Sequence, residues 1–277
     1  MIVRAPATSA NLGPGFDCAG VALGLWNELE VTDGDGGAVT VVVEGEGAGE
    51  LPEDESNLVV RAFALRAAPE GKRFRLHNRI PLESGLGSSA AAIVLGLVAA
   101  GPADAPEELL ELGLRLEPHA DNLAPALVGG VCLTWDGRIA KIADRLPLDA
   151  LLVIPPERTS TIAARSLLPR DIPHEDASFT VARALLLGAA ISSADAELMR
   201  EALADRLHEP YRSSTLLEAI RADLPRGAAG ATLSGSGPTV VVWATDATEC
   251  AAHLMARLPR HRVVPLAVAE RGALFQL

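Results

Sequence analysis

The sequence PLESGLGSSAAAIVLGL, residues 81–97, combines spaced glycines and adjacent serines with a following apolar segment. Its glycines Gly85 and Gly87 and the adjacent Ser88 and Ser89 run directly into an apolar, alanine-rich segment that predicts a buried helix. The first N–H groups of a helix have no intrahelical partner and carry about half a positive charge. Glycines let such amides approach an anion without a Cβ in the way. The stretch therefore predicts either a phosphate-binding loop or a serine-capped helix after a Gly-Ser loop.

Composition limits the classes of partner. The chain has 277 residues, 49% hydrophobic and only 3% aromatic, so a sizeable core must be filled mainly by Ala, Val and Leu. A net charge of −12 argues against nucleic acid or an anionic membrane held by a general positive field. No signal peptide is expected at the N-terminus, and the apolar run at 90–100 is too short to span a bilayer. Three widely spaced cysteines without a CxxC pair fit reduced thiols, so we expect a cytoplasmic protein.

Both helices and strands are expected along the chain. In the first half, β-like segments at 28–31 and 38–43 flank DGDGG at 33–37, which predicts a hairpin. Helices are expected at 58–68, with Ser56 or Asn57 as N-cap, and at 88–100 and 106–116. Strands are expected at 74–81 and 131–135.

A new set of elements begins at an apolar strand, LDALLVIP, at 148–155. Helices are expected at 181–190, 194–207 and 215–220, and strands at 231–244 and 262–269. These patterns predict an α+β protein in two lobes, with one domain at 1–148 and a second at 149–277.

Two further glycine-rich segments flank the first in sequence. PATSANLGPGFDCAG occupies residues 6–20, and ATLSGSGPTVVVWA occupies residues 231–244. Together, in this order and spacing, the three segments resemble the three motifs of the GHMP kinase superfamily. SANLGPGFD at 9–17, PHADNLAPALVGG at 118–130, TSTIAARSLLP at 159–169 and HEPYR at 208–212 resemble its homoserine kinase family in particular.

The resemblance implies a fold and an activity. The fold is the two-lobed GHMP kinase fold, with an N-terminal ribosomal-protein-S5-like domain and a C-terminal α+β sandwich domain. The activity is transfer of the ATP γ-phosphoryl group, with Mg²⁺, to the side-chain hydroxyl of L-homoserine in threonine biosynthesis, and a homodimer could form. Alternatives are another GHMP kinase acting on a small hydroxylated acid or isoprenoid precursor, and a non-catalytic amino-acid or nucleotide binder.

The resemblance assigns ATP to the glycine loop and its surroundings. Asn57 matches a position near the adenine, although its simplest role is that of a helix N-cap. No lysine follows Gly87, so this is not the GxxxxGK[ST] nucleotide loop. The full set of expected nucleotide contacts is Asn57, Pro81, Glu83, Ser84, Gly85, Leu86, Gly87, Ser88, Ser89 and Ala90.

The amino-acid substrate needs partners for an ammonium and a carboxylate. Asp17 is a suitable partner for the ammonium, and Arg165 and Arg212 match the carboxylate-binding arginines of the family, against the alternative that they are surface arginines. Thr161 would lie beside Arg165 if the stretch is helical. The expected substrate contacts are Asn11, Asp17, Thr161, Arg165, Arg212 and Gly237.

The PHADN segment supplies the expected catalytic residues His119, Asp121 and Asn122, beside the substrate hydroxyl. His119 could instead be an ordinary loop histidine, and Asp121 either a general base or a brace for the loop. For Mg²⁺ we expect oxygen ligands beside the phosphates, namely Ser89 and Glu117. Glu111 is the alternative carboxylate, because Pro118 replaces a glycine usual in the family and could shift Glu117.

Overall fold

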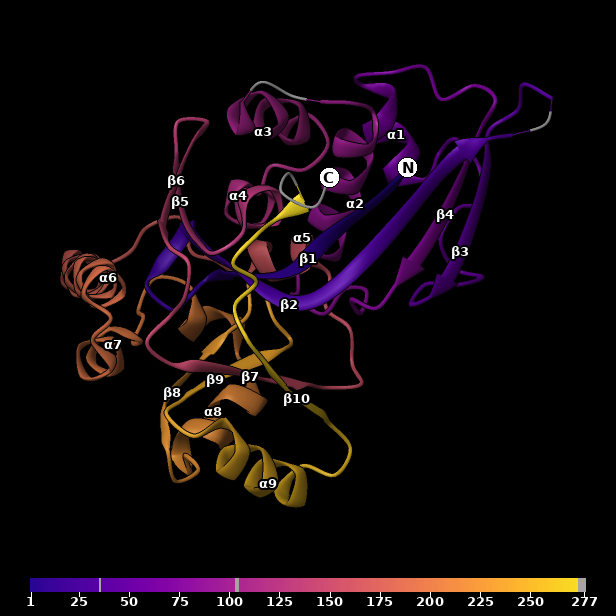
Figure 1. Ribbon diagram of the computed structural model, residues 1–277. Helices are drawn as coiled ribbons and strands as arrows, with labels where there is room; N and C mark the ends of the chain where they lie inside the picture. The colour runs from indigo at the N-terminus through magenta and orange to yellow at the C-terminus, as the bar shows by residue number, and fades with distance from the viewer. Residues whose placement is uncertain (35, 103–104, 274–277) are drawn as a thin grey trace.

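The computed structural model describes residues 1–34, 36–102 and 105–273. It contains two β-sheets with helices packed on them, arranged as an upper and a lower lobe in Figure 1. Within the described residues, no helix is both long enough and apolar enough to cross a bilayer.

The first sheet is built around two long strands, β1 (Ile2–Asn11) and β2 (Gly15–Asp33), paired antiparallel. Its order is β3-β4-β2-β5-β6, with β3 at Thr40–Gly45, β4 at Lys72–Asn78, β5 at Val131–Trp135 and β6 at Arg138–Ala143. The end of β1 and the start of β2 carry the first glycine-rich segment, so the pairing of these two strands fixes its position.

The hairpin predicted around 33–37 is wrong. β4 lies between the two strands that flank it, antiparallel to β2 and parallel to β3. β3 then connects to β4 by a β–α–β crossover through α1 (Leu58–Ala64), and this crossover places β4 between β2 and β3. The turn residues at 33–37 do not show which strand pairs with β2. Residue 35 lies outside the described residues.

Helices α2 (Ser88–Ala99) and α4 (Ala120–Val128) pack directly on the first sheet, α1 packs mainly on α2, and α3 (Pro106–Leu114) packs mainly on α2 and α4. Figure 1 shows them together on one side of β1 and β2. Gly96 of α2 allows a close crossing with α1, because a Cβ there would lie 2.2 Å from the Val59 carbonyl oxygen. α2 is buried along most of its length, as its alanine-rich sequence predicts.

The second sheet has the order β10-β7-β9-β8, all antiparallel. Its strands are β7 (Asp149–Ile154), β8 (Ala228–Leu233), β9 (Val240–Ala244) and β10 (Arg262–Leu266). Helices α8 (Thr215–Ala222) and α9 (Ala247–Arg257) pack on it. The connection from β7 to β8 contains α5 (Thr161–Ser166), α6 (His174–Ser193), α7 (Ala196–Ala202) and the short 3-10 helix η1 (Glu209–Arg212).

We propose a domain boundary at residue 148, between the last strand of the first sheet and the first strand of the second. The chain after β10 is an exception, because it returns to the first sheet. The Ala269 amide donates to the Ala22 carbonyl at 2.9 Å, and the Gly130 amide donates to the Ala269 carbonyl at 2.8 Å. Residues 267–273 thus pack with the first lobe. Residues 274–277, at the end of the proposed second domain, lie outside the described residues.

Candidate active site

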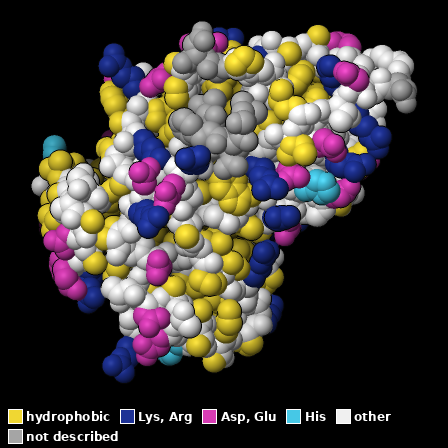
Figure 2. Space-filling view, viewed as in Figure 1, with side chains coloured by type: hydrophobic (Ala, Val, Ile, Leu, Met, Phe, Trp, Pro, Cys, Tyr) yellow, Lys and Arg dark blue, Asp and Glu magenta, His cyan; other side chains and the backbone are white. Residues whose placement is uncertain are grey.

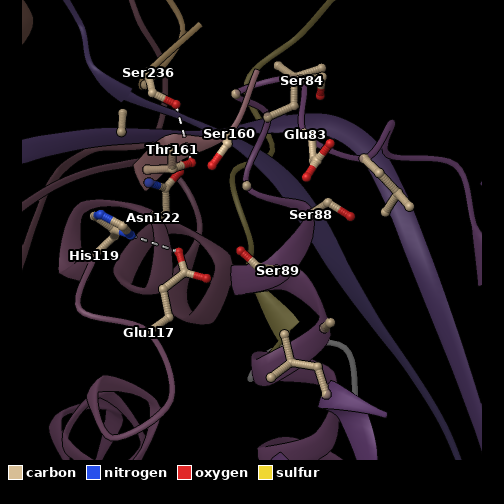
Figure 3. Close-up of a pocket in the computed structure, with 18 of the residues that line it drawn as sticks. Glu83, Ser84, Ser88, Ser89, Glu117, His119, Asn122, Ser160, Thr161 and Ser236 are labelled. Carbon is tan, nitrogen blue, oxygen red and sulfur yellow. Dashed lines mark hydrogen bonds and ion pairs between the residues drawn. The ribbon is translucent and has the colours of Figure 1, made fainter. Parts of the chain in front are cut away.

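A cavity of about 540 Å³ lies where both halves of the chain meet. This volume falls within the roughly 300–1,000 Å³ usual for small-molecule sites. All three glycine-rich segments contribute to its wall, together with the turns before α1, α4 and α5 and the residue Arg212 of η1. Figure 3 shows Ser88 and Ser89 on one side of this space and Glu117, His119, Asn122 and Thr161 on the other.

The glycine loop is shaped by two left-handed glycines. Gly85 has φ +79° and Gly87 has φ +66°, a region that favours glycine. Packing requires glycine as well, because a Cβ on Gly85 would lie 2.3 Å from the Ser234 carbonyl oxygen. Gly87 is the N-cap of α2 and brings no side chain to the helix end, so the serine-capped alternative is wrong. The first amides of α2 are therefore left for an anion in the cavity.

Ser234 ties the three glycine-rich segments together. Its fully buried hydroxyl oxygen lies 2.7 Å from the Gly85 carbonyl oxygen and 3.0 Å from Ser9 Oγ. From the first segment, Asn11 Nδ2 donates to the Gly235 carbonyl at 3.0 Å. Segments more than 200 residues apart in sequence thus form one hydrogen-bonded unit.

Asp17 and Arg165 form an ion pair at the cavity wall. Arg165 donates to the two carboxylate oxygens of Asp17 at 3.1 and 2.5 Å. The carboxylate raises the pKa of the Arg165 guanidinium further. Asp17 is held in a left-handed conformation, φ +57°, and its amide donates to Asn11 Oδ1 at 2.9 Å. The side chains predicted for opposite ends of an amino acid therefore lie together.

Phe16 supports both arginines predicted to bind carboxylate. The guanidinium carbons of Arg165 and Arg212 lie 5.6 and 5.8 Å from the centre of its ring, within the range of cation–π contact. Arg212 also donates to the Gly235 carbonyl, and its buried Nε has no hydrogen-bond partner among the described residues. Burial lowers the pKa of Arg212. Such a guanidinium is suited to receiving an anion.

The Phe16 ring in turn stacks on His208, with ring centres 5.0 Å apart. His208 is fully buried, its Nε2 lies 2.7 Å from the Gly13 carbonyl oxygen, and burial lowers its pKa to about 4. A carbonyl oxygen only accepts, so Nε2–H is the donor to Gly13. Asp205 fixes the start of η1 by accepting from the amides of His208 and Glu209 at 2.8 and 2.9 Å.

The PHADN segment places three side chains at the cavity wall. His119 Nδ1 lies 3.3 Å from a carboxylate oxygen of Glu117, and this hydrogen bond raises the pKa of His119 (Figure 3). Asp121, in the first turn of α4, is only 3% exposed. Burial, and secondarily the charge of Asp17, raises the Asp121 pKa to about 6. Its Oδ1 has no hydrogen-bond partner in the described structure, so this oxygen does not brace the loop.

The two candidate metal carboxylates differ in position. Glu117 lines the cavity with a side chain 14% exposed, whereas Glu111 lies on α3, is 77% exposed and pairs with Arg115. Ser89 faces the same space as Glu117 (Figure 3). Among the described residues, no three His, Cys, Asp or Glu side chains gather into a metal site of their own. The donors present suit a hard cation that takes its other ligands from phosphate and water.

Comparisons with known proteins agree with this geometry. Residues 57–130 match the family model described as the GHMP kinases N terminal domain. The chain is 42% identical to the homoserine kinase of Clavibacter michiganensis subsp. michiganensis, over 99% of this chain and 93% of that protein. It is 39% identical to the homoserine kinase of Moorella thermoacetica, over 87% of this chain and 86% of that protein.

The chain belongs to the homoserine kinase family. The homoserine kinase structure from Cytophaga hutchinsonii has a TM-score of 0.87 at 28% identity, covering 98% of this chain and 96% of that one. A mevalonate kinase structure has a TM-score of 0.73 at 16% identity, covering 97% of this chain and 99% of that one, and shares the fold. The predicted resemblance and the predicted two-sheet α+β fold are thereby confirmed.

Most residues predicted for a homoserine kinase site line the cavity, and three do not. Ala90 is fully buried in the core, and Pro81 contributes only a carbonyl that accepts from Ser84 Oγ at 2.8 Å. Gly237 lies behind the wall, where its carbonyl would contact a Cβ on Gly85. Asn57 lines the cavity and is the N-cap of α1, accepting from the Val59 amide at 3.0 Å.

Several lining residues were not predicted from the sequence. Ser160 and Ser236 lie inside motifs already noticed, directly beside Thr161 and Gly235, so the motifs themselves were the available signal. Asn27 and Asn78 carry no motif signal. The pairing of β2 with β4, in which Glu28 lies opposite His77, brings these two asparagines to the same part of the wall.

Proposed function

We propose that the cavity carries out homoserine phosphorylation, transferring the γ-phosphoryl group of ATP to the side-chain hydroxyl of L-homoserine to give O-phospho-L-homoserine. One observation carries the proposal: an uncapped helix N-terminus at Gly87 shares a single cavity with Asp17, Arg165 and Arg212. An anion site and a zwitterion site side by side suit direct in-line transfer, which depends on positioning and charge neutralisation.

The triphosphate is assigned to the loop from Glu83 to Ser89. Backbone amides of Gly85, Gly87 and the first turn of α2 are the donors, and the helix dipole adds local positive potential. This arrangement explains how a chain of net charge −12 binds ATP without a loop lysine. On the face drawn in Figure 2, acidic side chains lie among the basic ones, so a broad positive field is not the source of affinity.

L-Homoserine is assigned to the opposite side of the cavity. Its carboxylate binds Arg165 and Arg212, and its ammonium binds Asp17, with Asn11 and Thr161 completing the contacts. The Thr161 hydroxyl lies 3.3 Å from Ser236 Oγ, which joins α5 to the third glycine segment (Figure 3). Phe16 lies within cation–π distance of both guanidinium groups.

Mg²⁺ fits the oxygen donors between the two halves of the cavity, and we assign Ser89 and Glu117 to hold it. When bound, the ion neutralises charge on the phosphate oxygens. The low exposure of Glu117, compared with that of Glu111, supports the choice between these two carboxylates.

His119 and Asn122 are assigned to the acceptor hydroxyl. The Asp121 oxygen that lacks a partner is buried, and we propose that Asp121 acts through its charge, which helps to raise the His119 pKa. The hydroxyl proton then leaves late, to the transferred phosphate or to water, as a loose transition state allows.

Turnover of different acceptors tests the proposal. ADP release is measured at saturating MgATP with L-homoserine, mevalonate, galactose and shikimate. We expect turnover with homoserine at least 100-fold above the others, because only homoserine offers both charges to the Asp17 and arginine side. Absence of turnover with homoserine would overturn the proposal.

A cytoplasmic location is expected, because ATP and intermediates of amino-acid synthesis are found there. We also propose a homodimer, supported by Val181 and Leu185 of α6, which are 59% and 72% exposed and form an apolar surface. Light scattering measures the mass directly, and a mass of one chain at micromolar concentration would contradict the dimer.

A further inference from the structure

Thr8 of β1 joins two parts of the site. It is fully buried, and its amide donates to the Leu86 carbonyl of the glycine loop at 3.0 Å. Its hydroxyl donates to Asn122 Oδ1 at 2.7 Å, across 114 residues of sequence. One residue of the central strand thus connects the loop assigned to ATP with the amide assigned to the acceptor hydroxyl.

In the structure, the Thr8 contact leaves the amino end of the Asn122 amide free to face the cavity. An asparagine presents a carbonyl oxygen, which accepts, and an amino group, which donates. Oδ1 is held by Thr8, and Nδ2 makes no hydrogen bond with the protein in the described residues. Because Asn122 lines the cavity, its free donor is the group available to a ligand.

We propose that Thr8 is a positioning residue, whose hydroxyl fixes Asn122 with its NH₂ group toward the reacting oxygens. This inference rests on the proposed function. Both the acceptor hydroxyl oxygen and the γ-phosphate oxygens have lone pairs that accept from NH₂. A reversed amide would place its carbonyl oxygen against an anionic phosphate, which is repulsive. A threonine hydroxyl both donates and accepts, so the anionic ligand disfavours the reversed amide and Thr8 holds the productive one by donating to Asn122 Oδ1.

The space around the contact supports a specific role for a small hydroxyl side chain. A Cβ on Gly87 would lie 1.9 Å from Thr8 Oγ1 and 3.1 Å from Asn122 Oδ1. The hydrogen bond therefore lies directly against the glycine loop, and the glycine leaves room for it. Valine has the shape of threonine without the donor, and serine keeps the donor.

Thr8→Val and Thr8→Ser test the proposal in steady-state assays. We expect Thr8→Val to lower kcat about tenfold, the upper range for losing one hydrogen bond, with the homoserine KM and ADP affinity within about twofold. Thr8→Ser should keep kcat within about threefold of the wild type. In an Asn122→Ala background, Thr8→Val should change kcat less than about twofold, because Thr8 acts through Asn122. Equal losses in both backgrounds, or equal losses for valine and serine, would overturn the proposal.

A structural readout separates this inference from the proposed function. The side-chain NH₂ resonances of Asn122, identified by their loss in Asn122→Ala, should shift or broaden in ligand-free Thr8→Val and remain in Thr8→Ser. Unchanged resonances in Thr8→Val would refute positioning, whether or not homoserine is a substrate. Conversely, a wild type inactive on homoserine would refute the function alone.

Thr232→Val is the matched control. Thr232 is also a fully buried threonine, and its hydroxyl accepts from Trp243 Nε1 at 3.0 Å in the second sheet. We expect it to share any loss of stability with Thr8→Val and to leave kcat and the Asn122 resonances unchanged. Should Thr8→Val not fold, Thr8→Ala, which also lacks the hydroxyl, replaces it in every arm.

Discussion

Arg165 and Asp17 are hydrogen-bonded to each other through both carboxylate oxygens, so the two groups proposed to bind opposite ends of homoserine neutralise one another. Both side chains are partly exposed, at 49% and 38%, and an exposed ion pair contributes only about 0–1 kcal/mol. The pair is therefore easily exchanged. A zwitterion can replace both contacts at once, whereas an acceptor with one charge leaves one partner unpaired.

Acceptors that lack one charge test this exchange. We expect 4-hydroxybutyrate, which has the carboxylate and hydroxyl but no ammonium, to show kcat/KM at least about 100-fold below that of homoserine, since a charge-assisted contact contributes ~1.5–3 kcal/mol and Asp17 also loses its partner. In Asp17→Asn the discrimination between the two acceptors should shrink. Unchanged discrimination in that variant would contradict the role of Asp17.

Arg212→Ala should raise the homoserine KM by roughly 10- to 100-fold, because one charge-assisted contact to the carboxylate is lost. The affinity for ADP without homoserine should stay near that of the wild type, since Arg212 lies on η1 and its hydrogen bond goes to Gly235 and not to residues 83–89. Arg200→Ala is a suitable control, because this arginine lies on α7, pairs with the exposed Glu197 and does not line the cavity. A change confined to nucleotide binding would contradict the assignment of Arg212.

Ser89→Ala should lower kcat with a severity that depends on the metal. The variant removes one proposed oxygen ligand, so kcat should recover in part when Mg²⁺ is raised or replaced by Mn²⁺, which binds such sites more tightly. Ser88→Ala is the matched control, since Ser88 also lines the cavity but is not assigned to the ion. Equal losses at every metal concentration would argue against metal ligation by Ser89.

How far the sequence predicts this molecule depends on whether a feature is local. The glycine segments, the helix after Gly87 and the cap at Asn57 are local patterns, and the structure contains them. Pairings between distant segments leave no local trace. The position of β4 beside β2 made the predicted hairpin wrong. The same pairing brings Asn27 and Asn78 into the cavity wall, which no local sequence pattern predicted.

Thr8 shows the same limit within a motif. It lies in the first glycine-rich segment, yet the partner that explains it is 114 residues away. The left-handed Asp17 and the stacking of Phe16 on His208 likewise require three-dimensional neighbours. Residue types predicted the chemistry of the site, whereas the orientation of each side chain depends on contacts that only the fold provides.

Asp121→Asn gives a prediction for both stability and catalysis. The pKa of Asp121 in the folded state, about 6, lies above its unfolded value of about 3.9, so the folded state binds more protons between these values. Stabilisation by the protonated form is complete below pH ~4 and is lost as the pH rises through about 6, at a cost on the order of 3 kcal/mol. Asparagine does not ionise, so the stability of the Asp121→Asn variant relative to that of the wild type should increase between pH 4 and 7.

Urea unfolding of both proteins at pH 4.5 and 7.5 measures this difference, and parallel stability profiles would contradict the raised pKa. For catalysis, we expect kcat of Asp121→Asn to stay within about tenfold of the wild type, because the buried carboxylate is proposed to act only through its charge. General-base catalysis contributes ~10²–10⁴-fold, so a loss above about 100-fold would instead make Asp121 the proton acceptor.

Asp205→Asn is unsuitable as a control, since that carboxylate accepts three amide hydrogen bonds at the start of η1. Glu111→Gln, on the exposed face of α3, provides the matched loss of one carboxylate and should leave both stability profile and kcat unchanged.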